Sequence, residues 1–174
     1  SVVEITARGE ASHAGNRPDY AANPLLELSY LIIELESLCD KKRGVWYSPV
    51  SLHGGDVGAT AMTPADASVI YDIRYLNEDL GREVLHTLRP KLKNVHLEIS
   101  GGREKPPFAQ SEIHAKVYNR AKEIVEELGY PYQPARLGGG SDCNFTASVG
   151  CPSLCGLGLN GDFLHNPKEY VQID

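Results

Sequence analysis

Apolar residues recur along the first hundred positions with two different periods. Residues 2–8 have the composition of a strand. Residues 67–75 alternate, with Val69, Tyr71, Ile73 and Tyr75 on one face. A period of two predicts strands. We predict further strands over residues 45–52 and around residues 95–99, where Val95, Leu97 and Ile99 alternate.

Two other segments have the period of an amphipathic helix. The first begins at Asn23, a favourable N-cap, with Pro24 at the first helical position. Its apolar stripe consists of Leu25, Leu28, Ile32, Leu35 and Cys39, and we expect it to end at residues 41–44, where three cations precede a glycine. The second begins at Asn77 and stops at Pro90, with Leu80, Val84 and Leu88 as its stripe.

The predicted order over the first hundred residues is β-α-β-β-α-β. This order is typical of the ferredoxin-like fold, an antiparallel sheet with two helices on one face, so the fold class is α/β in the α+β sense. The second part of the chain differs. Residues 101–110, with Gly-Gly and Pro-Pro pairs, predict a linker.

Beyond the linker, the pattern predicts an amphipathic helix over residues 111–128. It then predicts a short strand at 135–137, a Gly-rich loop at 138–142, a short helix at 143–149, a short strand at 152–157 and a loop to the end. These elements are too few to close a hydrophobic core. We therefore expect this part to be a piece of an α/β layer.

Charge and hydropathy exclude two classes of partner. The net charge is −6, and the longest basic run is Lys41-Lys42-Arg43, so we expect no nucleic-acid partner. No apolar run approaches membrane-spanning length, so we expect no membrane partner. We expect a cytoplasmic location. The four cysteines are too sparse for a disulfide framework. Cys151 and Cys155 are interpreted as small buried hydrophobes rather than as metal ligands with His165.

Three local motifs occur in a specific order. The first is Ala11-Ser12-His13-Ala14-Gly15, followed by Pro18 and Ala22-Asn23. The second is Asp72-Ile73-Arg74-Tyr75. The third is Gly138-Gly139-Gly140-Ser141-Asp142-Cys143-Asn144-Phe145, followed by Gly150-Cys151-Pro152, Gly156-Leu157-Gly158, and His165 ahead of Glu169-Tyr170. In this order the set resembles the co-catalytic zinc exopeptidases and deacetylases, which include glutamate carboxypeptidase, acetylornithine deacetylase, succinyl-diaminopimelate desuccinylase and aminoacylase.

The resemblance implies a domain organisation and an activity. Residues 1–104 would be a ferredoxin-like dimerisation domain, and residues 105–174 a C-terminal fragment of the catalytic domain. The full protein would be a homodimeric hydrolase with two zinc ions per site, or cobalt or manganese. It would cleave an amide bond of a small carboxylate-bearing substrate, an N-acyl amino acid or a short peptide.

Two residues of the first part are candidates for chemistry. A neutral imidazole at His13 can donate to a developing oxyanion, although a histidine that caps a turn explains it equally well. The resemblance implies that His13 reaches across the dimer into the partner's active site. Arg74 lies opposite the apolar face of its strand, where a solvated arginine is the ordinary explanation. The resemblance implies that Arg74 binds the substrate carboxylate, which a guanidinium recognises with two parallel hydrogen bonds.

Four residues of the second part are also candidates. Backbone N–H groups at Gly139, Gly140 and Ser141 can face an anion, and the resemblance implies substrate binding there. Simple helix capping by Ser141 and Asp142 is the alternative, and both can hold together. A lone histidine such as His165 is usually not a metal ligand, but the resemblance implies that it is the last zinc ligand.

The chain also departs from the family pattern. No histidine precedes x-Asp, and no Glu-Glu pair lies in a suitable loop, so most of the expected zinc ligands and the general base are missing. Ala61 stands where the family often has an asparagine that contacts substrate. These departures leave two alternatives open: a non-catalytic dimerisation module, and a small metal-binding regulatory domain. The substrate itself does not follow from the sequence.

Overall fold

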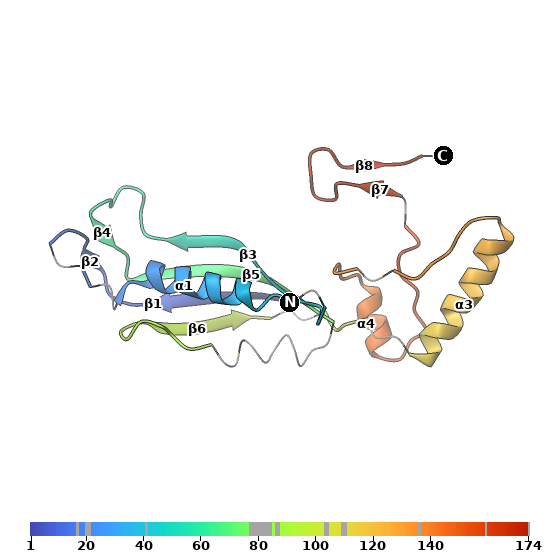
Figure 1. Ribbon diagram of the computed structural model, residues 1–174, viewed down its shortest axis with the longest axis horizontal. Helices are drawn as coiled ribbons and strands as arrows, with labels where there is room; N and C mark the ends of the chain where they lie inside the picture. The colour runs from blue at the N-terminus through green and yellow to red at the C-terminus, as the bar shows by residue number, and fades with distance from the viewer. Residues whose placement is uncertain are drawn as a thin grey trace. The chain divides into compact units, whose positions relative to one another are not determined.

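The computed structural model describes residues 1–16, 18–19, 22–40, 42–76, 85, 88–102, 105–108, 111–135, 137–158 and 160–173. The chain divides into two units, Ser1–Pro107 (unit 1) and Phe108–Asp174 (unit 2). Figure 1 shows unit 1 as a sheet with a helix on one face, and unit 2 as two helices with long connecting loops. Among the described residues, no helix is long and apolar enough to cross a membrane.

Unit 1 is built on a four-stranded antiparallel sheet. The strands are β1 (Val2–Arg8), β3 (Val45–Gly54), β5 (Asp66–Tyr75) and β6 (His96–Gly101), in the spatial order β3-β5-β1-β6. Val2 lies opposite Asp72 and Arg8 opposite Asp66, so β1 and β5 pair along their full lengths. This order confirms the predicted ferredoxin-like arrangement of strands. The predicted helix from Asn77 to Pro90 lies largely outside the described residues.

Alternation decides which side chains form the core of unit 1. Ala67, Val69, Tyr71 and Ile73 of β5 are buried, and the residues between them are half-buried. The helix α1 (Pro24–Ser37) covers this face with Leu28, Leu31 and Leu35, which are fully buried. The other core residues come from the neighbouring strands and the segment before β6: Val3, Ile5, Ala7, Val45, Tyr47, Leu88 and Val95.

The start of α1 agrees with the prediction, whereas its end does not. Asn23 is the N-cap, and its side-chain oxygen accepts from the N–H groups of Leu25 and Leu26 at 3.0 and 3.3 Å. The helix ends at Ser37, before the basic run. Asp40 is responsible, because its carboxylate accepts from the N–H groups of Lys42 and Arg43 and its backbone forms a bridge to Val45. This turn redirects the chain into β3.

An additional ladder lies at one end of the sheet. Between β3 and β5, where the sequence pattern predicts no strand, lies β4 (Met62–Thr63), which pairs with β2 (Ser12–His13). Two-residue strands produce no readable alternation, so the sequence pattern could not reveal them. In Figure 1, β2 and β4 form a lobe beyond the end of β1.

Unit 2 contains α3 (Glu112–Glu127), α4 (Cys143–Ser148) and a small ladder of β7 (Gly161–Asp162) and β8 (Tyr170–Val171). Both helices were predicted. The strand predicted at 152–157 is wrong, because these residues are not in a strand. The strand predicted at 135–137 lies partly outside the described residues, and residues 135 and 137 are not in a strand. In and just before the segment 152–157, two carbonyls accept from side chains. His114 Nε2 lies 3.2 Å from the Cys151 carbonyl, and Cys143 Sγ lies 3.3 Å from that of Leu154.

Few side chains of unit 2 are buried. Among its described residues, only His114 and Ser153 are buried, and no hydrophobic residue is. Cys151 and Cys155 are exposed, which corrects their interpretation as buried hydrophobes. They lie on a loop segment that the described part of unit 2 does not cover. Unit 2 therefore has no hydrophobic core of its own among the described residues.

Candidate functional site

The imidazole of His13 is held in one orientation by the backbone after it. Nδ1 accepts hydrogen bonds from the N–H groups of Gly15 and Asn16, both at 3.1 Å. Because Nδ1 is an acceptor, the neutral ring has its proton on Nε2. The side chain is exposed. His13 therefore both closes a turn, as the simpler interpretation required, and presents an N–H donor outward.

The β2–β4 ladder fixes the position of His13. Ser12 N donates to Thr63 Oγ1 at 3.0 Å, and the two hydroxyl oxygens are 2.8 Å apart. Ala14 N donates to the carbonyl of Ala61 at 2.8 Å, on the other side of His13. His13 itself lies opposite Met62. Hydrogen bonds thus hold the residues on both sides of the histidine.

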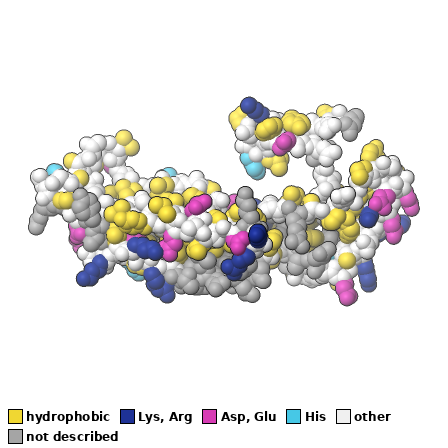
Figure 2. Space-filling model, viewed as in Figure 1, with side chains coloured by type: hydrophobic (Ala, Val, Ile, Leu, Met, Phe, Trp, Pro, Cys, Tyr) yellow, Lys and Arg dark blue, Asp and Glu magenta, His cyan; other side chains and the backbone are white. Residues whose placement is uncertain are grey.

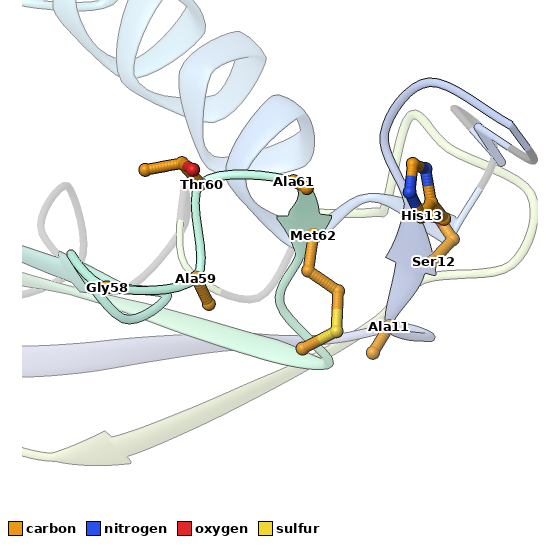
Figure 3. Close-up of a pocket in the computed structure, with 8 residues that line it drawn as sticks. All are labelled: Ala11, Ser12, His13, Gly58, Ala59, Thr60, Ala61 and Met62. Carbon is orange, nitrogen blue, oxygen red and sulfur yellow. The ribbon is translucent and has the colours of Figure 1, made fainter.

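A shallow pocket of about 370 Å³ lies beside His13. Figure 3 shows that two chain segments form it, and that its long side chains are those of His13 and Met62. We call it the β2–β4 pocket; its lining residues are Ala11, Ser12, His13, Gly58, Ala59, Thr60, Ala61 and Met62. The pocket did not follow from the sequence. The one signal in this segment was Ala61 in place of an expected asparagine.

Arg74 lies near the end of β5 with its guanidinium on Asp72. Nε donates to Asp72 Oδ1 at 2.8 Å and Nη2 to Oδ2 at 2.5 Å. The hydrogen bond to Asp72 raises the pKa of Arg74 above its usual value. The two side chains are 42% and 27% exposed. Asp72 therefore fixes the plane of the guanidinium while leaving part of it accessible to solvent.

His13 and Arg74 lie toward opposite ends of the sheet. The β2–β4 ladder adjoins Asp66, at the start of β5, and Arg74 is eight positions further along this strand. A strand rises about 3.3 Å per residue, which puts Asp66 and Arg74 about 26 Å apart. One small substrate cannot contact His13 and Arg74 of the same subunit.

The Gly-rich loop of unit 2 precedes α4. Gly139 and Gly140 are exposed, and a Cβ on Gly139 would meet no atom within 4 Å. Ser141 N donates to Asn144 Oδ1 at 2.9 Å, and Ser141 Oγ accepts from Cys143 N at 3.2 Å. Ser141 thus caps the start of the helix, as one interpretation predicted, whereas Asp142 makes no side-chain cap. Ser141 Oγ also lies 3.0 Å from Cys155 Sγ.

His165 lies in the turn between β7 and β8. Its φ of 63° is unusual for a non-glycine residue, and its N–H donates to Glu169 Oε2 at 3.2 Å. The imidazole is exposed. Within the described part of the chain, no three His, Cys, Asp or Glu side chains gather as a metal site. His165 is thus available as one ligand, and further ligands would come from elsewhere.

Comparisons with known proteins define the family. The profile of the peptidase dimerisation domain matches residues 2–100, and the chain belongs to this family. Carboxypeptidase G2 of Pseudomonas sp. (strain RS-16) is 30% identical over 178 residues, which cover 98% of this chain and 42% of that enzyme. The chain therefore spans less than half the length of this homologue.

Solved structures show the same fold. Aminopeptidase PepT from Bacillus cereus has a TM-score of 0.67 at 20% identity, with 98% of this chain and 46% of that chain covered. A tripeptidase from Staphylococcus aureus has a TM-score of 0.66 at 18% identity, with coverage of 97% and 45%. A hydantoinase/carbamoylase family amidase from Burkholderia ambifaria has a TM-score of 0.62 at 16% identity, with coverage of 87% and 38%. The relatives are thus named as peptidases and amidases.

Proposed function

We propose that this chain is part of a homodimeric, metal-dependent amidohydrolase of the carboxypeptidase or deacetylase type. Residues 1–104 form its dimerisation domain, and residues 105–174 the C-terminal part of its catalytic domain. The substrate is an N-acyl amino acid or short peptide with a free carboxylate. The main support is the similarity to carboxypeptidase G2, which extends over 98% of the chain and so beyond the dimerisation domain.

The tautomer of His13 supports a role in stabilising the transition state. Hydrolysis of an amide develops negative charge on the carbonyl oxygen. An Nε2–H that is already oriented can donate to this oxygen without reorganisation. The two backbone donors on Nδ1 provide that orientation.

The separation of His13 and Arg74 supports a site shared between two subunits. In a two-fold dimer, each subunit can supply one end of its sheet to each of two active sites. Arg74 would then bind the substrate carboxylate in its own subunit. Gly139, Gly140 and Ser141 are further candidates for substrate binding. His13 would act in the site of the partner. The fork of hydrogen bonds to Asp72 fixes the guanidinium for planar carboxylate recognition.

His165 would be one zinc ligand. An exposed imidazole in a turn suits zinc, and equally cobalt or manganese. A catalytic zinc needs about three protein ligands, so residues outside the described part of this chain would complete a two-metal site. When bound, such metals activate water and polarise the scissile carbonyl. Within this chain, Glu169 accepts the backbone N–H of His165 and so helps to hold the turn in place.

Mixed dimers of the full-length protein test this assignment. His13→Ala should lower kcat by about a hundred- to a thousandfold with bound metal unchanged, because one oxyanion donor is lost. His165→Ala should lower bound metal. Subunits of the two variants are then mixed in equal amounts. Each mixed dimer has one site with an intact His165 set and an intact His13 from the neighbour, so about a quarter of the wild-type activity should return.

The control for this experiment is the mixture of each variant with itself after the same exchange treatment. Formation of mixed dimers is measured with differently tagged subunits. Mixed dimers that are as inactive as either parent would refute the action of His13 in trans. If the full-length wild-type protein hydrolyses no N-acyl amino acid or peptide with any of the three metals, the proposed function itself is wrong.

The second candidate function is a non-catalytic dimerisation module. The observation that favours it is that the described residues supply His165 without two companion ligands. The native gene product distinguishes the two functions. A preceding segment with a His-x-Asp pair and a Glu-Glu pair decides for the hydrolase, and a native protein without them decides for the module.

A further inference from the structure

The β2–β4 pocket has an apolar lining next to the proposed catalytic donor. Ala11, Ala59, Ala61 and Met62 contribute methyl, methylene and thioether groups, and none of its eight lining residues is charged. Its volume of about 370 Å³ is at the small end of the range for small-molecule sites. Such a pocket suits one uncharged substituent of a ligand rather than a whole ligand.

Several polar groups of the pocket wall already have hydrogen-bond partners. The N–H groups of Gly58 and Ala59 donate to Asp56, and the N–H of Met62 donates to the carbonyl of Ala59 at 3.2 Å. The carbonyl of Ala61 accepts from Ala14. Ser12 Oγ is engaged with Thr63 Oγ1. These groups offer a polar substituent little to replace its hydration, and incomplete replacement is unfavourable.

We propose that the β2–β4 pocket binds the apolar acyl chain of the substrate and makes the enzyme selective for acyl groups longer than acetyl. This proposal rests on the proposed function. If His13 Nε2 donates to the carbonyl oxygen of the amide, the acyl chain starts from the same carbonyl carbon. The carboxylate on the amine side is directed to the partner subunit's Arg74, so the acyl side faces the pocket. Ala61, where the family often has a polar side chain, makes this wall apolar.

The test uses the full-length enzyme and a series of N-acyl amino acids: acetyl, propanoyl, butanoyl and pentanoyl derivatives of one amino acid. Each buried methylene contributes about 0.8 kcal/mol, so kcat/KM should rise about fourfold per methylene. Ala61→Leu fills the pocket. It should abolish the increase of kcat/KM with chain length. Met62→Ala removes one wall and should reduce the increase per methylene.

Val57→Leu is the matched control, because Val57 is 96% exposed in the same loop and does not line the pocket. It should behave as wild type, and Trp46 fluorescence checks that each variant is folded. A wild-type kcat/KM that is flat or falls with chain length overturns the proposal. So does an unchanged chain-length dependence in folded Ala61→Leu and Met62→Ala. Absence of turnover on every substrate overturns the proposed function and this proposal together, whereas turnover without chain-length selectivity overturns this proposal alone.

Discussion

Glu27 gives the sharpest test of how unit 1 is held together. It lies in α1 and is fully buried. Its carboxylate accepts hydrogen bonds from the backbone N–H of Lys91, at 2.8 and 3.1 Å, and from that of Leu92 at 2.7 Å. These contacts join α1 to the turn after Pro90, more than sixty residues away, and this turn leads into β6. We predict that Glu27→Ala destabilises unit 1 strongly.

The magnitude follows from the contacts. A hydrogen bond to a charged group contributes about 1.5–3 kcal/mol, so the loss of the acceptor for two N–H donors costs about 3–6 kcal/mol. Removal of a buried carboxylate also recovers its desolvation, which lowers the total. We therefore expect the lower end, about 3 kcal/mol. Glu27→Gln keeps one acceptor oxygen and should cost less than Glu27→Ala.

Glu34→Ala is the matched control. Glu34 lies on the same helix, and its carboxylate pairs with Nζ of the same Lys91 at 3.0 Å. The two side chains of this pair are 36% and 49% exposed, so the pair contributes about 0.2–1 kcal/mol. The comparison of Glu27→Ala with Glu34→Ala separates the effect of a buried contact with Lys91 from that of an exposed contact with the same residue.

Urea unfolding followed by tryptophan fluorescence measures the effect. Trp46 is the only tryptophan in the sequence and lies in β3, so its signal reports on unit 1. The free energy of unfolding should fall by about 3 kcal/mol in Glu27→Ala and by less than about 1 kcal/mol in Glu34→Ala. If the two variants agree within about 0.5 kcal/mol, which is the effect of an ordinary surface change, the buried carboxylate does not hold the turn as argued.

Three further predictions concern the core, the activity and the assembly. Burial, and secondarily the charge of Cys39, raise the pKa of Tyr71 to about 12. The free energy of unfolding should therefore be unaffected below pH 10 and should fall by about 2–3 kcal/mol between pH 10 and 12. Between pH 9 and pH 11.5, urea unfolding should show a smaller fall for Tyr71→Phe than for wild type, and equal falls would contradict this. The 174-residue chain alone should hydrolyse no N-acyl amino acid, and metal-dependent turnover above a His165→Ala control would contradict this. Unit 1 should self-associate through α1 or an edge strand. Ile33→Asp, at a site 69% exposed, should weaken the dimer in sedimentation equilibrium, whereas Val57→Asp should not. A wild-type protein that is only monomeric at high concentration would count against self-association.

The surface of unit 1 supports the last of these predictions. Tyr30 and Ile33 are exposed on α1, and Val50 and Leu52 are exposed on the edge strand β3. Figure 2 shows hydrophobic side chains gathered over α1 on the face in view. Exposed apolar groups of this kind favour association with another surface.

Local patterns determined most of the sheet and the start of each described long helix. The alternation at residues 67–75 required one buried face, and β5 has this face against α1. Asn23 and Pro24 specified the first turn of α1, because an N-cap acts through bonds to residues two and three positions away. Ser111 similarly begins α3, where its side chain accepts from the N–H of His114. Such features depend on neighbours in the chain, so the sequence alone reveals them.

The incorrect or missing predictions concern elements whose hydrogen-bond partners lie far away in the chain. The strand predicted at 152–157 needs a neighbouring strand, and the described part of unit 2 pairs none with it. The β2–β4 ladder depends on hydrogen bonds between residues about fifty positions apart. The end of α1 depended on the bridge from Asp40 to Val45, which competes with the last turn of the helix.

For the candidate site too, the sequence determined some features and the tertiary structure determined others. The motifs and their resemblance to a family selected His13, Arg74, the Gly-rich loop and His165 from the sequence, and their roles stay predictions. Only the tertiary structure decided that Nδ1 of His13 accepts from the backbone, that Asp72 holds Arg74, and that an apolar pocket lies beside Met62. It also decided that His13 and Arg74 lie toward opposite ends of one sheet. Distances between side chains arise from strand pairing across long sequence separations, and residue types and spacing do not encode them.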